Sequence, residues 1–300
     1  MDNLSLTISK EQNPDTQMLS ELPLIEVLSL LNQNDAEVPK AIKHELFEIE
    51  KVVELITQQI RCGGRLFYVG AGTSGRLGVL DSAECPPTFG TDPSLVQSII
   101  AGGQQAMLQA VENIEDCVES APKELKLRGL SSNDVVIGIA ASGRTPFVIS
   151  GLEYARDIGA KTVAISTRGR GLVCESADLS ICPDVGPEVL AGSTRMKSGS
   201  AQKMLLGMIS TAVMIQLGKV HGNLMIDVKP TNEKLRVRAQ NMVMQICDVK
   251  EAVAIKLLEN VGYNVRAAVL FYSLDISASE AKEIASQPYR SLNEQLDQGK

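Results

Sequence analysis

The chain has 300 residues, of which 44% are hydrophobic and 22% are charged, and its net charge at pH 7 is −7. This composition is typical of a globular protein, and the length suffices for one large domain with a smaller appendage. The negative charge argues against a nucleic-acid-binding protein, because such proteins are normally basic, and no apolar run is long enough to predict a membrane span.

Cysteine and histidine usage narrows the possible chemistry. The six cysteines include no C-x-x-C pair, and the two histidines are His44, expected to pack or face solvent, and His221, expected in a turn. We therefore expect reduced thiols and no histidine-rich metal site. The polar N-terminus lacks the apolar core of a signal peptide, so a cytoplasmic location is expected.

The predicted elements begin after a polar stretch, residues 1–18, which is predicted to be a flexible arm. Apolar residues recur at helical spacing over 19–31 and again over 37–61, where they predict one long amphipathic helix ending at Gly63-Gly64. Short β-rich runs then alternate with helical runs. The predicted strands cover 65–70, 96–101, 134–140, 161–166 and 178–182. The predicted helices cover 74–83, 104–119, 146–158 and a short stretch near 172.

This alternation predicts an α/β fold with a five-stranded, parallel, doubly wound sheet of flavodoxin-like order 2-1-3-4-5. Further helices are predicted over 197–217 and 232–246, and short helical runs follow to the C-terminus. The expected domains are the arm, a sheet domain with N-terminal helices over 19–246, and a small all-helical domain over 247–300.

Two loops rich in Gly, Ser and Thr follow the first and third predicted strands. Because these strands are neighbours in the predicted order, both loops should border the crevice where such sheets bind ligands. Each loop opens a helix, with Thr145 as a predicted N-cap and Pro146 at the first helical position. The pattern favours a phosphate cradle of hydroxyl and N–H groups over ordinary turns and caps. The candidate phosphate-binding residues are Gly72, Thr73, Ser74, Gly75, Arg76, Ser142, Gly143, Arg144 and Thr145.

Other nucleotide and phosphate motifs are missing from these loops. Neither loop is a G-x-G-x-x-G followed by an acidic strand end, and neither carries a Gly-Lys-Ser of the Walker type. Dinucleotides and ATP are therefore not expected as ligands.

A third candidate segment lies where irregular chain enters the predicted helix over 197–217. Ser193, Arg195 and Lys197 follow the fifth strand and should lie near the same edge of the sheet. The two cations could hold a phosphate or a substrate carboxylate. The alternative is a capped helix start with solvated charges.

Two carboxylates end predicted helices. Glu84 stands among apolar residues just before Cys85-Pro86-Pro87, which is expected to stop the first helix, and Glu115 ends the second helical run. Taken alone, each is more typical of a solvated helix end than of a catalytic acid or base. The residue pattern by itself does not select this pair.

Longer motifs resemble a known family. The segment GAGTSGRLGVLDSAECPPTFG over 70–90, together with ASGRTPFVISGLEYA, AGSTRMKSGSAQK and GNLMIDVKPTNEKL, resembles the N-acetylmuramic acid 6-phosphate etherases. This family is part of the sugar isomerase (SIS) domain superfamily. The resemblance extends from about residue 20 to the C-terminal helices, and the run over 70–87 is its most specific part.

The resemblance implies a bacterial carbon–oxygen lyase of amino sugar metabolism and peptidoglycan recycling, without metal or organic cofactor. Such an enzyme cleaves the D-lactyl ether of N-acetylmuramic acid 6-phosphate to N-acetylglucosamine 6-phosphate and D-lactate. The catalytic glutamates of the family match Glu84, assigned as the proton donor, and Glu115, assigned as the base. Two alternatives on the same fold are a non-catalytic sugar-phosphate sensor, like glucokinase regulatory protein, and a phosphosugar isomerase.

The spacing of the two glutamates raises a geometric problem. At about 1.5 Å per residue, a helix from Ser74 carries Glu84 roughly 15 Å from the first loop, and Glu115 is similarly remote from Gly103. Either these helices are broken or bent, or the carboxylates serve a neighbouring subunit. We therefore expect a homodimer with the site at or near its interface, and a small phosphosugar as the ligand.

Overall fold

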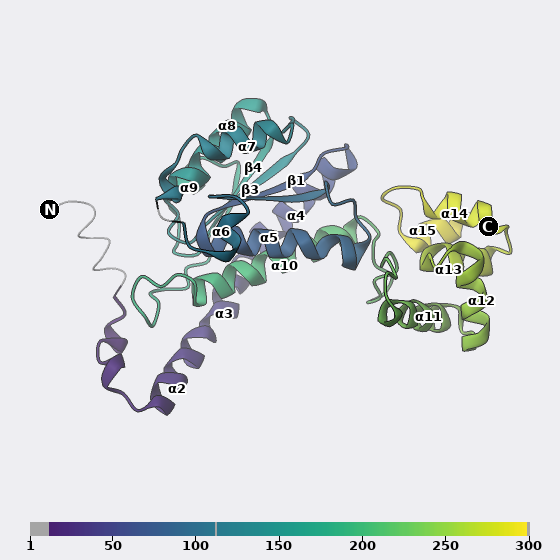
Figure 1. Cartoon of the computed structure of the whole chain (residues 1–300), viewed down its shortest axis with the longest axis horizontal. Coiled ribbons are helices and arrows are strands. Elements are labelled where there is room, and N and C mark those ends of the chain that lie inside the picture. Colours follow the sequence, from purple (N-terminus) through teal and green to yellow (C-terminus); the bar gives the residue numbers. More distant parts are fainter. Residues whose placement is uncertain (1–11, 112, 299–300) are drawn as a thin grey trace. The chain divides into compact units, whose positions relative to one another are not determined.

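The computed structural model describes residues 12–111 and 113–298 (Figure 1). The chain divides into two compact units. The first holds the chain up to Ser82 together with Ser94–Ile209, and the second holds Ala83–Pro93 together with the chain from Ser210. The first unit contains the sheet, and the second is helical.

The sheet has the predicted topology. Its five strands are all parallel and run in the order β2-β1-β3-β4-β5. The central strands are buried along their whole length, as expected of strands covered on both faces. The strands are β1 (Leu66–Gly70), β2 (Val96–Ile100), β3 (Val135–Ala140), β4 (Lys161–Ser166) and β5 (Leu179–Ile181).

Helices pack on both faces of this sheet (Figure 1). On one face α7 (Ser120–Leu127), α8 (Pro146–Ile158) and α9 (Leu172–Glu175) share a buried cluster with the strands, in which Phe67 contacts side chains such as Leu152. On the other face Tyr68 packs beside α5, and its hydroxyl donates to Asp81 Oδ2 at 2.8 Å. The helices of that side are α4 (Leu46–Arg61), α5 (Gly72–Phe89) and α10 (Lys197–Gln216).

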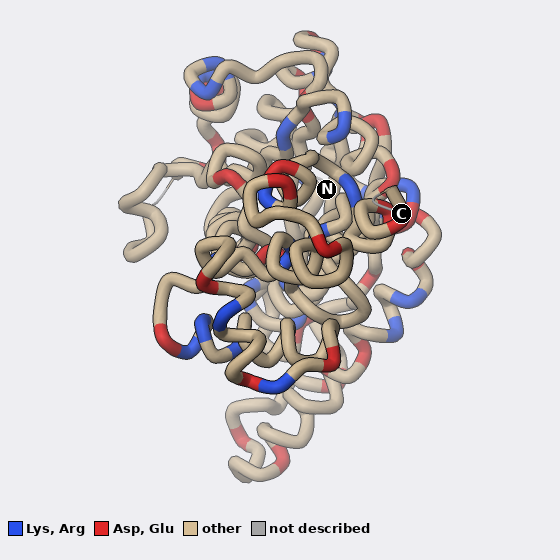
Figure 2. The backbone as a smooth tube through the Cα atoms, turned by 90° about the vertical axis from the view of Figure 1, so that its right-hand side faces the viewer, with Lys and Arg blue, Asp and Glu red and all other residues tan. Residues whose placement is uncertain are grey.

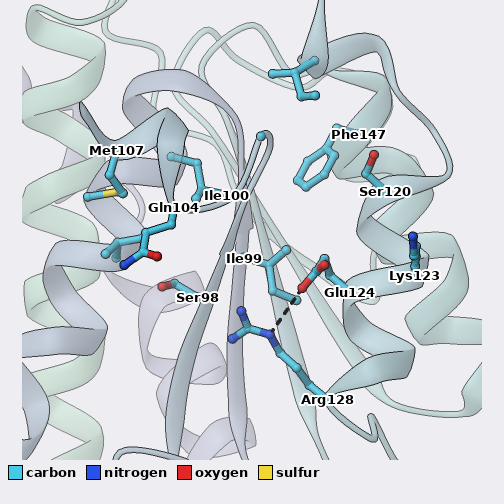
Figure 3. Close-up of a pocket in the computed structure, with 14 residues that line it drawn as sticks. Ser98, Ile99, Ile100, Gln104, Met107, Ser120, Lys123, Glu124, Arg128 and Phe147 are labelled. Carbon is cyan, nitrogen blue, oxygen red and sulfur yellow. Dashed lines mark ion pairs between the residues drawn. The ribbon is translucent and has the colours of Figure 1, made fainter. Parts of the chain in front are cut away.

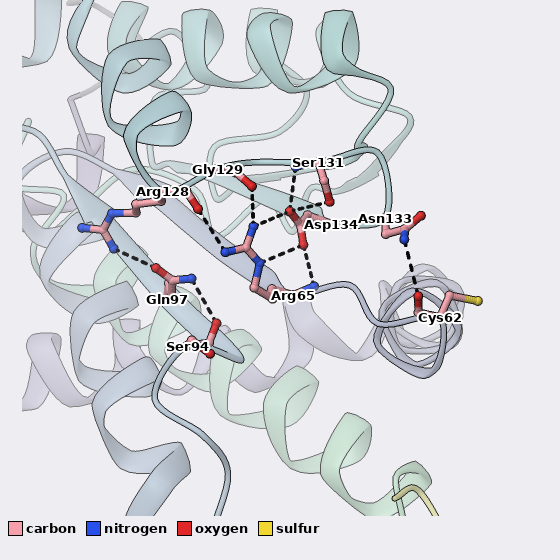
Figure 4. A network of polar contacts seen from close by, with 9 residues as sticks. All are labelled: Cys62, Arg65, Ser94, Gln97, Arg128, Gly129, Ser131, Asn133 and Asp134. Atoms are coloured by element: carbon pink, nitrogen blue, oxygen red, sulfur yellow. Dashed lines mark hydrogen bonds and ion pairs between the residues drawn. The ribbon is translucent and has the colours of Figure 1, made fainter.

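A polar network joins the amino ends of β1 and β3 (Figure 4). The Asp134 carboxylate accepts from the backbone N–H of Arg65 at 2.7 Å and from its guanidinium at 2.8 Å. The same guanidinium donates to the carbonyls of Arg128 and Gly129. Because these bonds join the amino ends of two neighbouring strands, the network anchors the end of the sheet opposite the two glycine-rich loops.

The N-terminal helices differ from the prediction. The expected single helix over 37–61 is two helices, α3 (Glu37–Lys43) and α4, which break at His44 and Glu45. The Glu45 carboxylate accepts from the backbone N–H of Cys182, just after β5, at 3.1 Å. The apolar pattern places Glu45 in the interior of the helix predicted over 37–61, whereas in the structure it binds a residue far away in the sequence.

The described part of the predicted arm, residues 12–18, contains a short helix. Residues 1–11 of the predicted arm lie outside the described residues. Beyond them, η1 (Pro14–Thr16) buries Thr16, whose hydroxyl donates to the Val189 carbonyl at 2.9 Å. The short helix η2 (Leu19–Glu21) and then α2 (Leu24–Asp35) follow.

The predicted stop of the first helix at Glu84 is wrong. Helix α5 continues through Pro86 and Pro87 to Phe89. A proline inside a helix lacks the N–H donor and crowds the carbonyl four residues earlier, which normally ends or bends the helix. Here the chain stays helical, and the Gly90 N–H donates to the Pro86 carbonyl at 2.9 Å.

The predicted helix over 104–119 is also wrong. Helix α6 (Gln105–Leu108) is one turn long, and Asn113 has a left-handed φ of 58° that interrupts any helix. Glu115 lies in the following 3-10 helix, η3 (Ile114–Asp116). Helix α7 follows at once and was not predicted.

The helical unit has a core of its own. Buried residues of α11, including Met242 and Val243, pack with those of the following helices, so the unit includes α11 rather than beginning at residue 247. Asn232, Asn264 and Ser277 cap three of its helices. These helices are α11 (Glu233–Cys247), α12 (Glu251–Val261), α13 (Val265–Leu274), α14 (Ala278–Ala285) and α15 (Leu292–Gln298), the last of which was not predicted.

Candidate active site

The first glycine-rich loop joins β1 to α5 in a tight turn. Gly72, the first residue of α5, has a φ of 53°, which favours glycine. A Cβ at Gly75 would lie 2.6 Å from the Gly70 carbonyl oxygen, so the backbone of α5 packs too closely on the end of β1 for a side chain at this position. Ser74 is buried and Gly72 is exposed. The turn therefore presents the first N–H groups of α5, which have no partner within the helix, at the surface.

The second loop joins β3 to α8 in a similar way. Gly143 has a φ of 69°, and its carbonyl accepts from the Val173 N–H at 3.0 Å. Pro146 occupies the first position of α8, as predicted, and Thr145 is the N-cap residue. The Thr145 side chain makes no capping hydrogen bond, contrary to its predicted role. Ser142 is exposed, and its Oγ accepts from the Arg144 N–H at 3.3 Å.

The sheet brings the two loops to one edge. Strands β1 and β3 are hydrogen-bonded neighbours, with Gly70 opposite Ile139. Because the strands are parallel, both loops leave from their carboxyl ends. This is the crevice predicted from the strand order, where sheets of this topology bind ligands.

The third segment lies against the first loop. A Cβ at Gly199, in the first turn of α10, would be 3.3 Å from Thr73 Cγ2. The buried Glu188 carboxylate accepts from the N–H groups of Lys197 at 3.0 Å and Ser198 at 2.9 Å, which caps α10. Sequence analysis missed Glu188. Its only signal was an acidic residue nine positions before the helix start.

The side chains of the third segment point to different surroundings. Lys197 is buried, and its ammonium group donates to Asn34 Oδ1 at 2.8 Å. Burial lowers the pKa of Lys197, and the Glu188 charge opposes this shift. Ser193 is half-buried, whereas Arg195 is exposed.

Glu115 and the first loop line one cavity. Its volume is about 340 Å³, and its wall includes Gly72, Arg76, Asn113 and Glu115. The Arg76 guanidinium donates to the carbonyls of Met107 and Gln109, which holds the segment after α6 beside α5. Of the two alternatives for Glu115, the broken helix is the one found, because the chain between α6 and η3 turns back to the loop.

Glu84 lies elsewhere on α5. It is exposed and belongs to the segment Ala83–Pro93 of the helical unit. Leu80, Ala83 and Pro87, which lie within one turn of it on the same helix face, are also exposed. This face of α5 thus carries apolar side chains beside a carboxylate.

A larger cavity of about 670 Å³ lies beside the edge strand β2 (Figure 3). Its apolar wall includes Ile99 and Phe147, and an ion pair between Glu124 and Arg128 at 3.9 Å borders it. None of the predicted site residues lines this cavity. The described residues contain no cluster of three potential metal ligands and no helix able to span a membrane.

The chain is similar to two domain models and to named enzymes. Residues 48–156 match the glucokinase regulatory protein N-terminal SIS domain, and residues 106–212 match the SIS domain. The N-acetylmuramic acid 6-phosphate etherase 2 of Lactiplantibacillus plantarum is 48% identical, over 93% of this chain and 94% of that protein. The N-acetylmuramic acid 6-phosphate etherase of Vibrio atlanticus is 49% identical, over 93% and 92%.

The chain belongs to the N-acetylmuramic acid 6-phosphate etherase family. This confirms the resemblance found in the motifs, and because these relatives are named as etherases the protein is an enzyme. The phosphoheptose isomerase of Francisella tularensis has the same sheet fold, with a TM-score of 0.52 and 15% identity, over 65% of this chain and all of that one. The phosphoheptose isomerase of Neisseria gonorrhoeae gives a TM-score of 0.50 at 16% identity, over 64% and 98%.

Proposed function

We propose that this protein is a carbon–oxygen lyase. It cleaves the D-lactyl ether of N-acetylmuramic acid 6-phosphate to N-acetylglucosamine 6-phosphate and D-lactate. The observation that carries the proposal is the 46–49% identity to etherases over more than nine-tenths of this chain. The cavity that holds Glu115 next to the first loop is consistent with it.

The substrate phosphate is held at the crevice between β1 and β3. Helix N-termini and glycine-rich turns bind phosphate through N–H groups that have no partner within the helix. Hydroxyl groups of Thr73, Ser74, Ser142 and Thr145 and the N–H group of Gly72 supply further donors, with Arg76 and Arg144 as cations. Gly75 and Gly143 shape the two turns, because their N–H groups already donate to the carbonyls of Ala71 and Ala140. Basic and acidic positions are mixed along the backbone (Figure 2), which favours a small anion bound by local donors over a polyanion.

The third segment completes substrate binding in this proposal. The exposed Arg195 and the nearby Ser193 are placed to take the lactyl carboxylate or the phosphate. Lys197 can contribute only if its ammonium group exchanges its bond to Asn34 for one to the substrate. Its lowered pKa makes a charged partner favourable, because an anion would stabilise the ammonium form.

The reaction needs two proton transfers and no metal. Opening of the pyranose ring exposes an aldehyde at C1, which acidifies the hydrogen on C2. Glu115 removes this proton as a general base. Glu84 protonates the lactyl oxygen as its bond to C3 breaks, which releases D-lactate and leaves a C2–C3 double bond. Water then adds at C3, so the net reaction consumes one water, and each positioned carboxylate can contribute about 10²–10⁴-fold in rate.

A homodimer is part of the proposal. Helix α5 is unbroken between Gly72 and Glu84, so the predicted distance between Glu84 and the first loop, which follows from the rise per residue of a helix, is unchanged. The exposed apolar residues around Glu84 on α5 suit contact with a second copy. We place Glu84 in the site of the partner subunit. A cytoplasmic location is also part of the proposal.

The decisive experiment is incubation with N-acetylmuramic acid 6-phosphate, followed by an enzymatic assay for D-lactate. We expect stoichiometric release of D-lactate and N-acetylglucosamine 6-phosphate. Binding of the sugar phosphate without any lactate would support the sensor alternative, which the match to the glucokinase regulatory protein domain keeps open. An aldose–ketose interconversion without lactate would support the isomerase alternative.

Separate glutamine variants assign the two glutamates. Glu115→Gln should abolish exchange of the C2 hydrogen with solvent, whereas Glu84→Gln should keep this exchange and lose lactate release. Asp116→Asn is a matched control, since Asp116 is an exposed neighbour in η3 that does not line the cavity. Near-normal turnover by both glutamine variants would overturn the assignment.

A further inference from the structure

Two cysteines meet beside the second glycine-rich loop. Cys174 lies in α9, and Cys182 directly follows β5. Their Sγ atoms are 3.1 Å apart, and neither thiol is in a disulfide. A disulfide requires about 2.0 Å between the two sulfurs, so the pair needs a shift of roughly 1 Å to close.

The surroundings of this pair activate one thiol. The hydrogen bond from Cys182 is the main cause that lowers the pKa of Cys174 to about 6, with a smaller contribution from the Arg170 guanidinium. The same bond raises the pKa of Cys182, which therefore remains the proton donor. Arg170 is held in place by a hydrogen bond from its guanidinium to Ser180 Oγ at 2.9 Å. The lowered pKa favours the thiolate of Cys174, which is the reactive form of cysteine.

The two thiols also differ in access. Cys174 is buried with 9% of its surface exposed, whereas Cys182 is half-buried. This combination suits a small, uncharged oxidant better than a bulky alkylating reagent. Hydrogen peroxide is the smallest oxidant of this class.

We infer that Cys174 and Cys182 form a peroxide-reactive pair that closes to an intrachain disulfide. The Cys174 thiolate attacks one peroxide oxygen, the O–O bond breaks, and hydroxide leaves to become water. The resulting sulfenic acid is then attacked by Cys182, which loses its proton as a second water is released. Two thiols are oxidised and one peroxide is reduced to two waters, so the step balances without any further reactant.

The position of the pair ties it to the candidate active site. The residue before Cys174 is Val173, whose N–H donates to the Gly143 carbonyl at 3.0 Å. Gly171 packs directly against Gly143, because a Cβ at Gly171 would lie 2.6 Å from the Gly143 carbonyl oxygen. A movement of α9 that closes the disulfide therefore acts on the loop that we propose to bind phosphate.

The test is peptide mapping of the reduced, full-length protein after brief treatment with hydrogen peroxide and blocking with N-ethylmaleimide. Glu175 lies between the two cysteines, so cleavage after glutamate separates them unless a disulfide joins the two peptides. We expect the Cys174–Cys182 link to form at least about tenfold faster than oxidation of Cys62 or Cys247. Cys62 is exposed, and burial raises the pKa of Cys247 to about 11.

Three variants make the inference falsifiable without reference to the etherase activity. Cys182→Ser should stop the reaction at a sulfenic acid on Cys174, which dimedone traps. Cys174→Ser should remove the fast reaction at position 182. Cys62→Ser, the matched control, should form the disulfide as fast as the unaltered chain. Oxidation of Cys174 no faster than that of Cys62, or a link from Cys174 to another cysteine, would overturn the inference.

Discussion

At the scale of single residues, the glycines of the two loops show which positions tolerate no side chain. Gly143 combines a left-handed φ of 69° with close neighbours, since a Cβ there would lie 2.9 Å from Ser166 Oγ and 3.0 Å from Gly171 Cα. Gly129 has a similar φ of 64°, but nothing lies within 4 Å of a Cβ built on it. A side chain at Gly129 would therefore meet backbone strain alone, whereas one at Gly143 would meet both backbone strain and steric crowding.

We predict that Gly143→Ala impairs the enzyme more than Gly129→Ala. Both variants should lose about 1–2 kcal/mol of stability from the left-handed backbone. Only Gly143→Ala should also displace Gly171 and the second loop, and lower the rate of lactate release at limiting substrate by tenfold or more. Thermal melts and steady-state assays measure the two effects. Equal activity in the two variants would count against a role for the second loop.

In the helical unit, the side chain of Arg266 holds several segments together. It is buried, and its guanidinium donates to both oxygens of Asp227, to Gln295 Oε1 and to the carbonyls of Gly218 and Arg290. One side chain of α13 therefore binds α15, the segment between α10 and α11, and the segment between α14 and α15. All its donors have partners, as a buried arginine requires.

Removal of this guanidinium should be costly. We predict that Arg266→Met destabilises the protein by up to about 3 kcal/mol, because the two carbonyls lose their buried donor and the Asp227 carboxylate keeps only its ion pair with Lys219, at 3.1 Å. Arg266→Lys should recover only part of this loss, since lysine cannot bind a carboxylate in bidentate fashion. Urea denaturation measures the difference. Arg290→Met, at an exposed position, is the control and should have little effect.

At the scale of elements, α9 and β5 bring together the two cysteines that the sequence treated as ordinary packing thiols. Charged groups beside the pair include Arg170, before α9, and Glu45, whose carboxylate accepts from the Cys182 N–H. The pairing depends on β5 lying next to β4, from which the chain leads into α9. No local pattern in the sequence contains this information.

The reaction of Cys174 with hydrogen peroxide should depend on pH in a characteristic way. Because its pKa is lowered to about 6, protonation below pH 6 removes the reactive thiolate and slows the reaction. The rate should level off above pH 7. Cys247, with a pKa raised to about 11, should become faster throughout this range and stay slower than Cys174. A rate at Cys174 that still increases tenfold between pH 7.5 and 8.5 would contradict the lowered pKa.

Helix α5 gives a second prediction at this scale. Pro87 is exposed and cannot donate to the carbonyl four residues earlier, so its presence costs helix stability. Pro87→Ala should raise the free energy of unfolding by up to about 3 kcal/mol. Thr88→Ala, which alters no backbone donor, should leave it nearly unchanged. A decrease in stability for Pro87→Ala would show that the helix depends on the proline at this position.

At the scale of the whole molecule, the distribution of exposed apolar residues points to a second copy. Helix α2 buries none of its side chains, and Leu24 and Ile25 are 74% and 73% exposed. Contiguous apolar exposure of this kind is typical of an interaction surface. It agrees with the homodimer that we propose from the position of Glu84.

Charged substitutions on α2 should separate assembly from folding. We predict that Leu24→Glu combined with Ile25→Glu leaves the melting temperature of the isolated chain unchanged, since neither side chain is buried, but yields a monomer by light scattering. Lactate release should fall with the dimer content. Leu127→Glu, at a leucine of α7 that is 70% exposed, is the control and should remain dimeric. A monomeric variant with full activity would disprove the shared site.

The sequence by itself determined the strands, the order of the sheet and the two loops at its carboxyl edge. These features follow from local patterns: apolar runs of strand length, glycine-rich turns and helix caps, which act within a few residues. The family motifs then selected Glu84 and Glu115, which no pattern of spacing singled out.

Only the tertiary structure decided how distant segments meet. The expected helix over 104–119 is interrupted, so Glu115 lies beside the first loop. Helix α5 continues through Pro86 and Pro87, and the Glu188 carboxylate caps the start of α10. Cys174 also lies beside Cys182. Such contacts depend on packing between elements, and the free energy of packing can override local helical preference. This is why the sequence predicted the elements and the structure determined which of their residues come together.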